Sequence, residues 1–213
     1  AEAAAVLTTT LLAFTVAALL AMPWLMYVIA PGFVDQPDKF QLTIELTQIT
    51  FPYLLFMALI ALMGGMLNSL HRFAAVAAAP IMLNIVLISA LLAVRQGVLP
   101  ESVFPTSGHA LAWGVFAAGV AQFFWIAHAC RRAGILFHPP RPRLSPSVRR
   151  LIALMVPGII GAGVVQINLV IDVILASTLA EGSVSYLYYA DRVNQLPLGV
   201  VGVAIGIVLL PLL

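Results

Sequence analysis

Residues 73–94 read FAAVAAAPIMLNIVLISALLAV and contain no charged side chain. A run of about 20 apolar residues is long enough to cross the hydrocarbon core of a membrane as a helix. Further apolar runs cover residues 4–30, 43–70, 110–130, 151–179 and 184–213. The sequence therefore predicts an all-α fold, a polytopic membrane helix bundle with six transmembrane helices.

The composition of the whole chain agrees with a membrane protein. Of the 213 residues, 62% are hydrophobic and 8% are charged, whereas about a quarter are charged in a soluble domain. So few charged side chains cannot cover the surface of a water-soluble protein of this size. Six spans also leave no room for a sizeable aqueous domain. The net charge is +2, but the arginines lie between apolar runs and form no long basic face, so we expect no nucleic-acid partner.

Basic residues in the loops predict the orientation and the division of the chain. The loops after the second and fourth spans hold seven arginines, and the loops after the first, third and fifth spans hold two basic residues. Short cytoplasmic loops accumulate Lys and Arg, so the chain is expected to enter its first span from the cytoplasm. We expect four spans in residues 1–130, an Arg/Pro-rich cytoplasmic linker over 131–150, which includes HPPRPR at 138–143, and two spans in 151–213.

Several features indicate what the chain lacks. It starts at Ala1 without a methionine and stops at Leu213 inside an apolar run, so we expect a piece of a longer protein. The single cysteine, Cys130, is expected to be a small apolar filler near a helix end. The four histidines form no HExxH pair, and no Gly-rich phosphate loop is present. We therefore predict no catalytic residue, no metal and no cofactor, and we leave the identity of a coupling ion open.

The fifth span has a polar face. Gly158, Gly161, Asn168 and Asp172 recur on one side of the predicted helix. A carboxylate near the bilayer centre costs about 2.5–3.5 kcal/mol, so Asp172 is expected to face a wet cavity or a partner. Asp172 could equally lie hydrated at the outer interface. We treat Asp172 and Asn168 as candidate cavity or ion-coupling residues.

The sixth span opens with an acid, a base and two amides, at Asp191, Arg192, Asn194 and Gln195. Asp191 and Gln195 can share a helix face, whereas Asp191 and Arg192 cannot, so the acid and the base are expected to have separate partners. The Arg192 guanidinium suits capture of an anionic headgroup in a cavity, with Asp191 orienting it or binding a cation. The alternatives are an interhelical ion pair that serves packing and a side chain that reaches toward the outer interface.

These residues carry a resemblance to a known family. The stretch GSVSYLYYADRVNQLPLGVVGVA at 182–204 resembles the MurJ (MviN) lipid II flippases of the multidrug/oligosaccharidyl-lipid/polysaccharide exporter superfamily. The stretches FPYLL at 51–55, GGMLNS at 64–69 and QINLVID at 166–172 fall in the order expected for that family. The resemblance covers nearly the whole chain and would correspond to spans three to eight of fourteen.

The resemblance implies a two-lobed exporter fold around a central cavity. Residues 1–130 would end the N-terminal lobe, 131–150 would connect the lobes in the cytoplasm, and 151–213 would start the C-terminal lobe. The implied activity is to move lipid II, the undecaprenyl-pyrophosphate-linked disaccharide pentapeptide, across the bacterial cytoplasmic membrane by alternating access. The family's Asp-Arg pair maps onto Asp191 and Arg192, and Gln195 stands where some relatives carry a carboxylate. The implied partners are lipid II, membrane lipids and the remaining spans of the same polypeptide.

Three other functions compete with this one. Another member of the superfamily, such as a different polysaccharide-precursor flippase or a drug exporter, would share the fold. A membrane scaffold would use the Asp191 and Arg192 pair for packing alone. A membrane enzyme acting on lipid-linked sugars would need a set of catalytic carboxylates or histidines in one cavity, and the sequence offers no convincing set.

Overall fold

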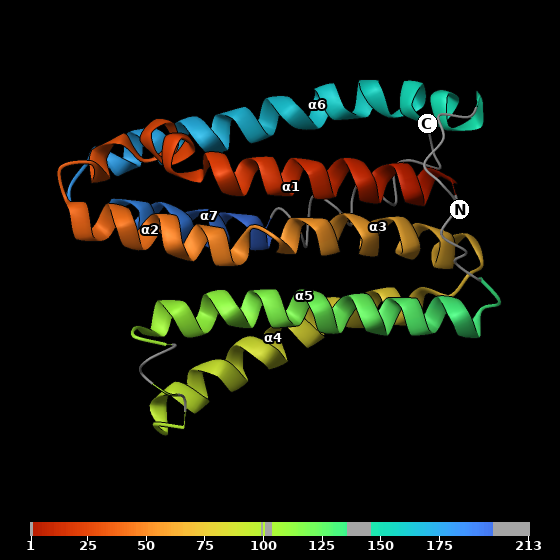
Figure 1. Ribbon diagram of the computed structural model, residues 1–213, viewed down its shortest axis with the longest axis horizontal. Helices are drawn as coiled ribbons and strands as arrows, with labels where there is room; N and C mark the ends of the chain where they lie inside the picture. Colours follow the sequence, from red (N-terminus) through yellow and green to blue (C-terminus); the bar gives the residue numbers. More distant parts are fainter. Residues whose placement is uncertain (1, 99, 101–103, 136–145, 198–213) are drawn as a thin grey trace. The chain divides into compact units, whose positions relative to one another are not determined.

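The structure, a computed structural model, describes residues 2–98, 100, 104–135 and 146–197. In these ranges the chain forms helices and no strand (Figure 1). The elements are α1 (Glu2–Ile29), η1 (Pro31–Phe33), α2 (Pro37–Thr50), α3 (Tyr53–Ser69), α4 (Phe73–Arg95), α5 (Ser107–Arg132), α6 (Pro146–Ser177) and α7 (Ser183–Pro197). The predicted all-α fold class is therefore confirmed.

Five helical segments are long and apolar enough to cross a membrane. They are Ala4–Ile29, Pro37–Ser69, Phe73–Arg95, Ser107–Arg132 and Val148–Ser177. They match the first five predicted spans. The sixth begins as α7, and the rest of the predicted span 184–213 lies outside the described residues beyond Pro197. The chain is thus a multi-pass membrane protein.

The second span differs from its prediction. We expected the second span to cover residues 43–70, but α2 already begins at Pro37. Proline suits the first turn of a helix because its missing N–H would have no partner there, and Asp38 in the same turn complements the helix dipole. The span is also interrupted, because α2 ends at Thr50 and α3 begins at Tyr53, after Pro52.

Helices extend into both ends of the predicted Arg/Pro-rich segment over residues 131–150. Helix α5 continues to Arg132, and α6 begins at Pro146, before the expected start at Leu151. The string at 138–143, on which the linker prediction rests, lies outside the described residues.

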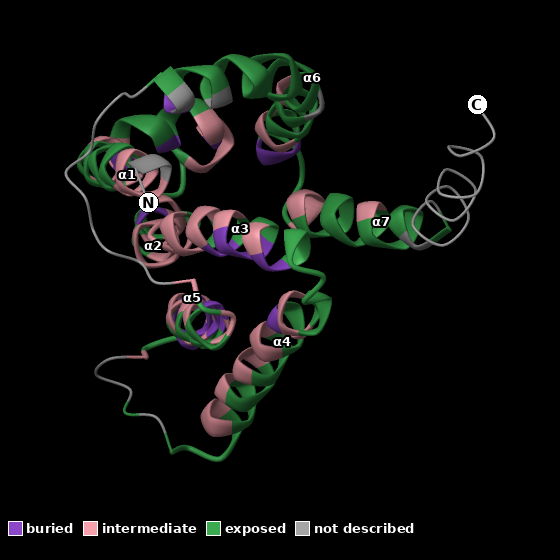
Figure 2. Ribbon diagram, turned by 90° about the vertical axis from the view of Figure 1, so that its right-hand side faces the viewer, coloured by how far each residue is buried: buried purple, intermediate pink, exposed green. Residues whose placement is uncertain are grey.

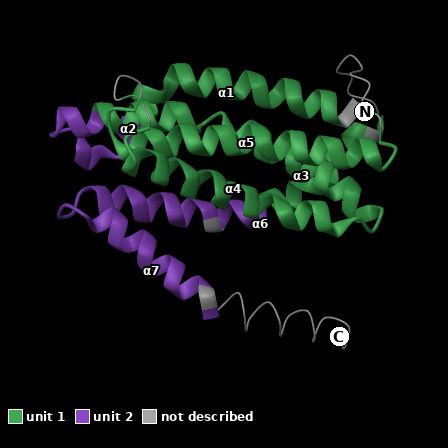
Figure 3. Ribbon diagram, turned by 90° about the horizontal axis from the view of Figure 1, so that it is seen from below, with its two compact units in different colours: residues 1–25, 41–159 green, residues 26–40, 160–213 purple. Residues whose placement is uncertain are grey.

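Contacts within the chain define two compact units, which Figure 3 shows in different colours. Unit 1 comprises residues 1–25 and 41–159, and unit 2 comprises residues 26–40 and 160–213.

Helix α5 is the most buried span of unit 1, as the concentration of buried residues along it shows (Figure 2). It packs against α3 and α4. The buried cluster formed by these three helices consists of Ile60, Met63, Leu67, Ala79, Ile126 and Cys130. Cys130 is a free, fully buried thiol in this cluster, which confirms the expectation that it serves as an apolar filler.

Many large apolar side chains of the described residues are exposed. Leu20, Trp24 and Leu154 each expose at least 70% of their surface. Such side chains would be buried in a water-soluble domain, and their exposure fits faces that lipid or further helices cover.

Two contacts fix the packing of α3 on α5. Gly119 lies so close to α3 that a Cβ atom on it would sit 2.6 Å from Cδ2 of Tyr53 and 3.0 Å from Cδ2 of Phe56. Gln122, which is 3% exposed, accepts a hydrogen bond of 3.2 Å from the Tyr53 hydroxyl and donates one of 2.6 Å to the carbonyl of Ala79 on α4. One amide therefore connects three spans.

Unit 2 contains a second close approach. The N–H of Gly32 in η1 donates to Oγ of Ser177 at the end of α6, over 3.3 Å. A Cβ atom on Gly32 would collide with the backbone of Ser177. Only glycine lets the chain between the first two spans approach the end of α6 this closely.

We predict that Gly119→Ala lowers the stability of the purified protein in detergent. The added methyl group would overlap Tyr53 and Phe56, and such overpacking costs about 1–3 kcal/mol. The matched control is Gly65→Ala on α3, where an added Cβ meets no atom within 4 Å. Thermal unfolding measures both. Equal midpoints for the two variants would contradict the close approach.

A second prediction concerns the Tyr53–Gln122 bond. Hydrogen bonds between membrane helices contribute about 0.6–2 kcal/mol. Tyr53→Phe and Gln122→Leu should each destabilise the protein, and the double variant should lose less than the sum because the two side chains share one bond. A double-mutant cycle on the free energy of unfolding measures this coupling. Strict additivity would show that the bond does not form.

Candidate functional site

The predicted site residues of the sixth span lie together on α7. Helix α7 begins at Ser183, directly after the Glu181–Gly182 turn, and is described to Pro197. Nε2 of Gln195 donates to Oδ2 of Asp191 over 2.5 Å, and Nη1 of Arg192 donates to Oε1 of the same Gln195 over 3.1 Å. One amide thus joins the acid to the base.

This arrangement corrects one expectation. Asp191 and Arg192 were expected to have separate partners, since neighbouring helix positions point about 100° apart. Gln195 follows Asp191 by four residues and Arg192 by three, so it lies next to both on the helix surface. Its side-chain carbonyl oxygen accepts from the Arg192 guanidinium and its amide nitrogen donates to the Asp191 carboxylate, so the two charges share one neutral partner.

The guanidinium of Arg192 also contacts an aromatic ring. Its central carbon lies 4.9 Å from the ring centroid of Tyr188, one turn earlier on α7. Tyr188 in turn makes an edge-to-face contact with Tyr189, with ring centroids 6.0 Å apart. The bond to Gln195 uses one of five guanidinium N–H groups. Arg192 is therefore held from within its own helix, and it is exposed in this chain.

Asp172 lines a hollow of about 430 Å³ between the end of α6 and the start of α7. The hollow is lined by Asp172, Leu175, Ala176, Leu179, Ser183, Tyr186, Leu187 and Ala190. Asn168 lies one helical turn before Asp172 and is exposed, but it is not part of this lining. Arg192 and Gln195 also lie outside it. The structure thus groups three of the predicted residues on α7 and places Asp172 in an adjoining hollow.

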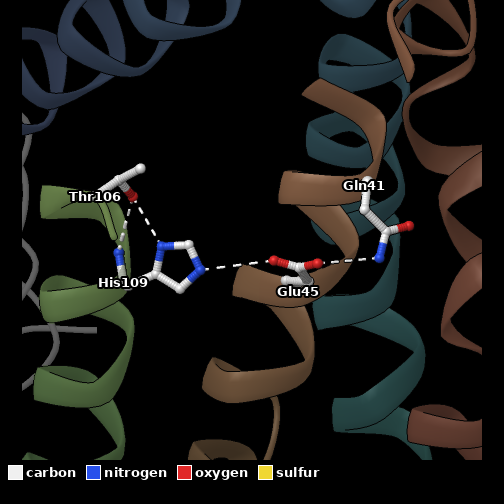
Figure 4. A network of polar contacts seen from close by, with 4 residues as sticks. All are labelled: Gln41, Glu45, Thr106 and His109. Atoms are coloured by element: carbon white, nitrogen blue, oxygen red, sulfur yellow. Dashed lines mark hydrogen bonds and ion pairs between the residues drawn. The ribbon is translucent and has the colours of Figure 1, made fainter. Parts of the chain in front are cut away.

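Sequence reasoning missed a polar network in unit 1. Glu45 on α2 faces His109 at the start of α5, and Thr106 and Gln41 contact these two residues (Figure 4). Next to this network lies a second hollow, of about 390 Å³. It is lined by Glu45, Gln48, Ile49, Pro52, His109, Trp113 and Phe116. Thr106 could have been found, because a threonine before an apolar run is typical of a helix N-cap.

Within the described ranges, no group of three or more His, Cys, Asp and Glu side chains could hold a metal ion.

Comparison with known proteins identifies the family. The family described as "Lipid II flippase MurJ" matches residues 2–213. This chain belongs to the lipid II flippase MurJ family. The chain is 51% identical over 212 residues to the "Probable lipid II flippase MurJ" of Rhizobium tropici, which covers 99% of this chain and 39% of that protein.

Other curated relatives agree. The chain is 50% identical over 211 residues to the "Probable lipid II flippase MurJ" of Rhizobium meliloti, with 99% of this chain and 39% of that protein covered. It is 35% identical over 192 residues to the "Lipid II flippase MurJ" of Burkholderia cenocepacia, with 88% of this chain and 36% of that protein covered. The chain spans about two fifths of the length of these MurJ relatives, as expected for a piece of a longer protein.

We predict that the hollow beside Asp172 holds water in the full-length protein. A thiol reacts as its thiolate, which forms in water and not in hydrocarbon. Asp172→Cys should therefore react with a membrane-impermeant maleimide in intact cells. The matched control is Ile171→Cys, which is exposed on the same helix but does not line the hollow, and the native Cys130 is fully buried. Equal labelling of the two introduced cysteines would contradict a wet hollow.

Proposed function

We propose that this chain is part of a lipid II flippase that works by alternating access in the bacterial cytoplasmic membrane. The observation that carries the proposal is the family match over residues 2–213, which includes the helix that bears Arg192. The curated relatives are named lipid II flippases, which supports a membrane transporter and not an enzyme as our proposal for this chain. Lipid II would be the substrate, and the bilayer lipids and the remaining spans of the protein would be its partners.

The physical task is to move a charged headgroup across about 30 Å of hydrocarbon while its lipid tail stays in the bilayer. A hydrated cationic cavity makes this feasible, because it replaces the water and counterions that the pyrophosphate would lose. Arg192 would supply part of that charge. A guanidinium is always protonated and matches phosphate oxygens with two parallel N–H groups.

The contacts on α7 support this role for Arg192. Gln195 and Tyr188 hold the guanidinium from two sides, so less conformational entropy is lost when an anion binds. Asp191 would orient the site through Gln195, because it bonds to the same amide. No carboxylate of the described residues forms an ion pair with Arg192, and the guanidinium therefore keeps donors for a ligand.

We also propose how the chain fits the whole transporter. Residues 1–130 would end the N-terminal lobe, 131–150 would form the cytoplasmic connection, and 151–213 would start the C-terminal lobe. Asp172 and Asn168 would then lie on the cavity side of the first helix of that lobe. A cation held near Asp172 or Asp191 would feel the membrane potential, which acts with about 2.3 kcal/mol per charge per 100 mV. Its inward movement would help to reset the carrier.

We predict that Arg192→Ala in the full-length protein weakens lipid II binding about tenfold to a hundredfold, since a hydrogen bond to a charged group contributes about 1.5–3 kcal/mol. Arg192→Lys should restore little, because an ammonium ion cannot grip phosphate with two parallel donors. Binding and flipping of lipid II in proteoliposomes measure both. Arg95→Ala, at the end of α4, serves as the matched control.

The two variants also separate a transporter from a scaffold. A protein that uses the α7 pair for packing alone would tolerate Arg192→Lys. If Arg192→Ala were expressed normally and supported both lipid II transport and cell-wall growth, the binding role of Arg192 would be wrong.

A further inference from the structure

The polar network of unit 1 centres on the buried imidazole of His109, which is 8% exposed (Figure 4). Its Nδ1 lies 2.8 Å from Oγ1 of Thr106, the N-cap of α5. Its Nε2 lies 3.6 Å from Oε2 of Glu45 on α2. The second oxygen of Glu45 accepts from Nε2 of Gln41 over 3.1 Å. The network thus links α2 to the start of α5.

The chemistry of these groups allows two protonation states. A carboxylate facing Nε2 favours a proton on that nitrogen, so in the neutral imidazole Nδ1 accepts a hydrogen bond from the Thr106 hydroxyl. When the imidazole gains a second proton, Nδ1 becomes a donor, and the same hydroxyl can rotate and accept. Thr106 therefore satisfies both states of His109, while Glu45 gains a cationic partner in only one of them.

The network lies where α2 and α5 of unit 1 are separated by a hollow. After the break at Pro52, α3 is held to α5 by the close approach at Gly119 and by the Tyr53–Gln122 bond. On the α2 side of this break, the hollow of about 390 Å³ is lined by residues of α2 and α5 and by Pro52 itself. The Glu45–His109 pair belongs to the lining of this hollow, and the Leu46 side chain lies close to Gly108 at the start of α5.

We propose that the Glu45–His109 pair is a proton-operated latch that holds α2 against α5. Protonation of His109 changes a contact between a neutral ring and a carboxylate into an ion pair, which draws α2 toward α5. Deprotonation releases that attraction, and the break between Thr50 and Tyr53 lets α2 move while α3 stays packed. By the predicted orientation the latch lies near the outer face of the membrane.

The surroundings of His109 contain few other ionisable groups. Glu45 faces it from α2, and the other lining residues of the hollow are not ionisable. Helix α3 contributes Tyr53, which bonds to Gln122, and α4 carries Arg95 at its end. Glu101, in the connection from α4 to α5, lies outside the described residues. The direction of the pH effect therefore follows from the pair itself, because protonation of the imidazole places a positive charge beside the Glu45 carboxylate.

The latch is tested by a distance measurement that needs no transport. Spin labels on Leu42→Cys in α2 and Ala117→Cys in α5 of the full-length protein in lipid nanodiscs report the separation of the two helices. The distance distribution should be narrow and short at about pH 5.5 and should broaden toward longer distances at about pH 8.5. His109→Gln and Glu45→Gln should each abolish this change. His128→Gln, at the other end of α5, should retain it.

A distribution that does not change with pH, or a change that persists in both His109→Gln and Glu45→Gln, would overturn the latch. Its link to alternating access rests on the proposed function, but the distances do not. If the distances change with pH and the Arg192 variants still transport lipid II normally, the latch stands and the proposed binding role fails. If the distances do not change with pH and the Arg192 variants lose lipid II transport, the binding role stands and the latch fails.

Discussion

The hydrocarbon core of a membrane contains no water that could bond to exposed polar groups, and the structure of this chain follows from that constraint. The backbone satisfies itself in long helices, and polar side chains inside the spans need partners from the protein. Gln122 shows the consequence most directly, because its amide connects Tyr53 on α3 with the carbonyl of Ala79 on α4. Where such polar contacts are present the helices pack closely, as at Gly119.

The second span divides unit 1 into a tight part and a loose part. Pro52 separates α2 from α3, and the two segments contact α5 in different ways. Helix α3 packs against α5 through small residues and a buried amide, whereas α2 meets α5 across a hollow with a titratable pair. The second span therefore combines one segment that packs closely on α5 with one that packs loosely on it. Proline breaks in membrane helices are tolerated when neighbouring groups satisfy the freed backbone.

The α7 cluster shows how a charged residue can be kept available inside a membrane protein. Arg192 is oriented by a neutral amide and by the face of Tyr188, and Asp191 acts on it only through Gln195. A direct ion pair would have neutralised the guanidinium and occupied its donors. In the proposed binding role the guanidinium would keep N–H donors for a ligand, and the same α-helical spacing that excludes a direct contact between adjacent residues brings Gln195 beside both.

The sequence by itself determined the all-α membrane fold, the first five spans, the buried role of Cys130 and the family, because length, hydropathy and local motifs are properties of contiguous residues. It also pointed to Asp191, Arg192 and Gln195, which lie within one helical turn or so of each other. Only the tertiary structure revealed the three-helix bond of Gln122 and the Glu45–His109 pair. These depend on which faces of distant helices meet, and close packing between helices selects those faces through contacts that no single segment encodes.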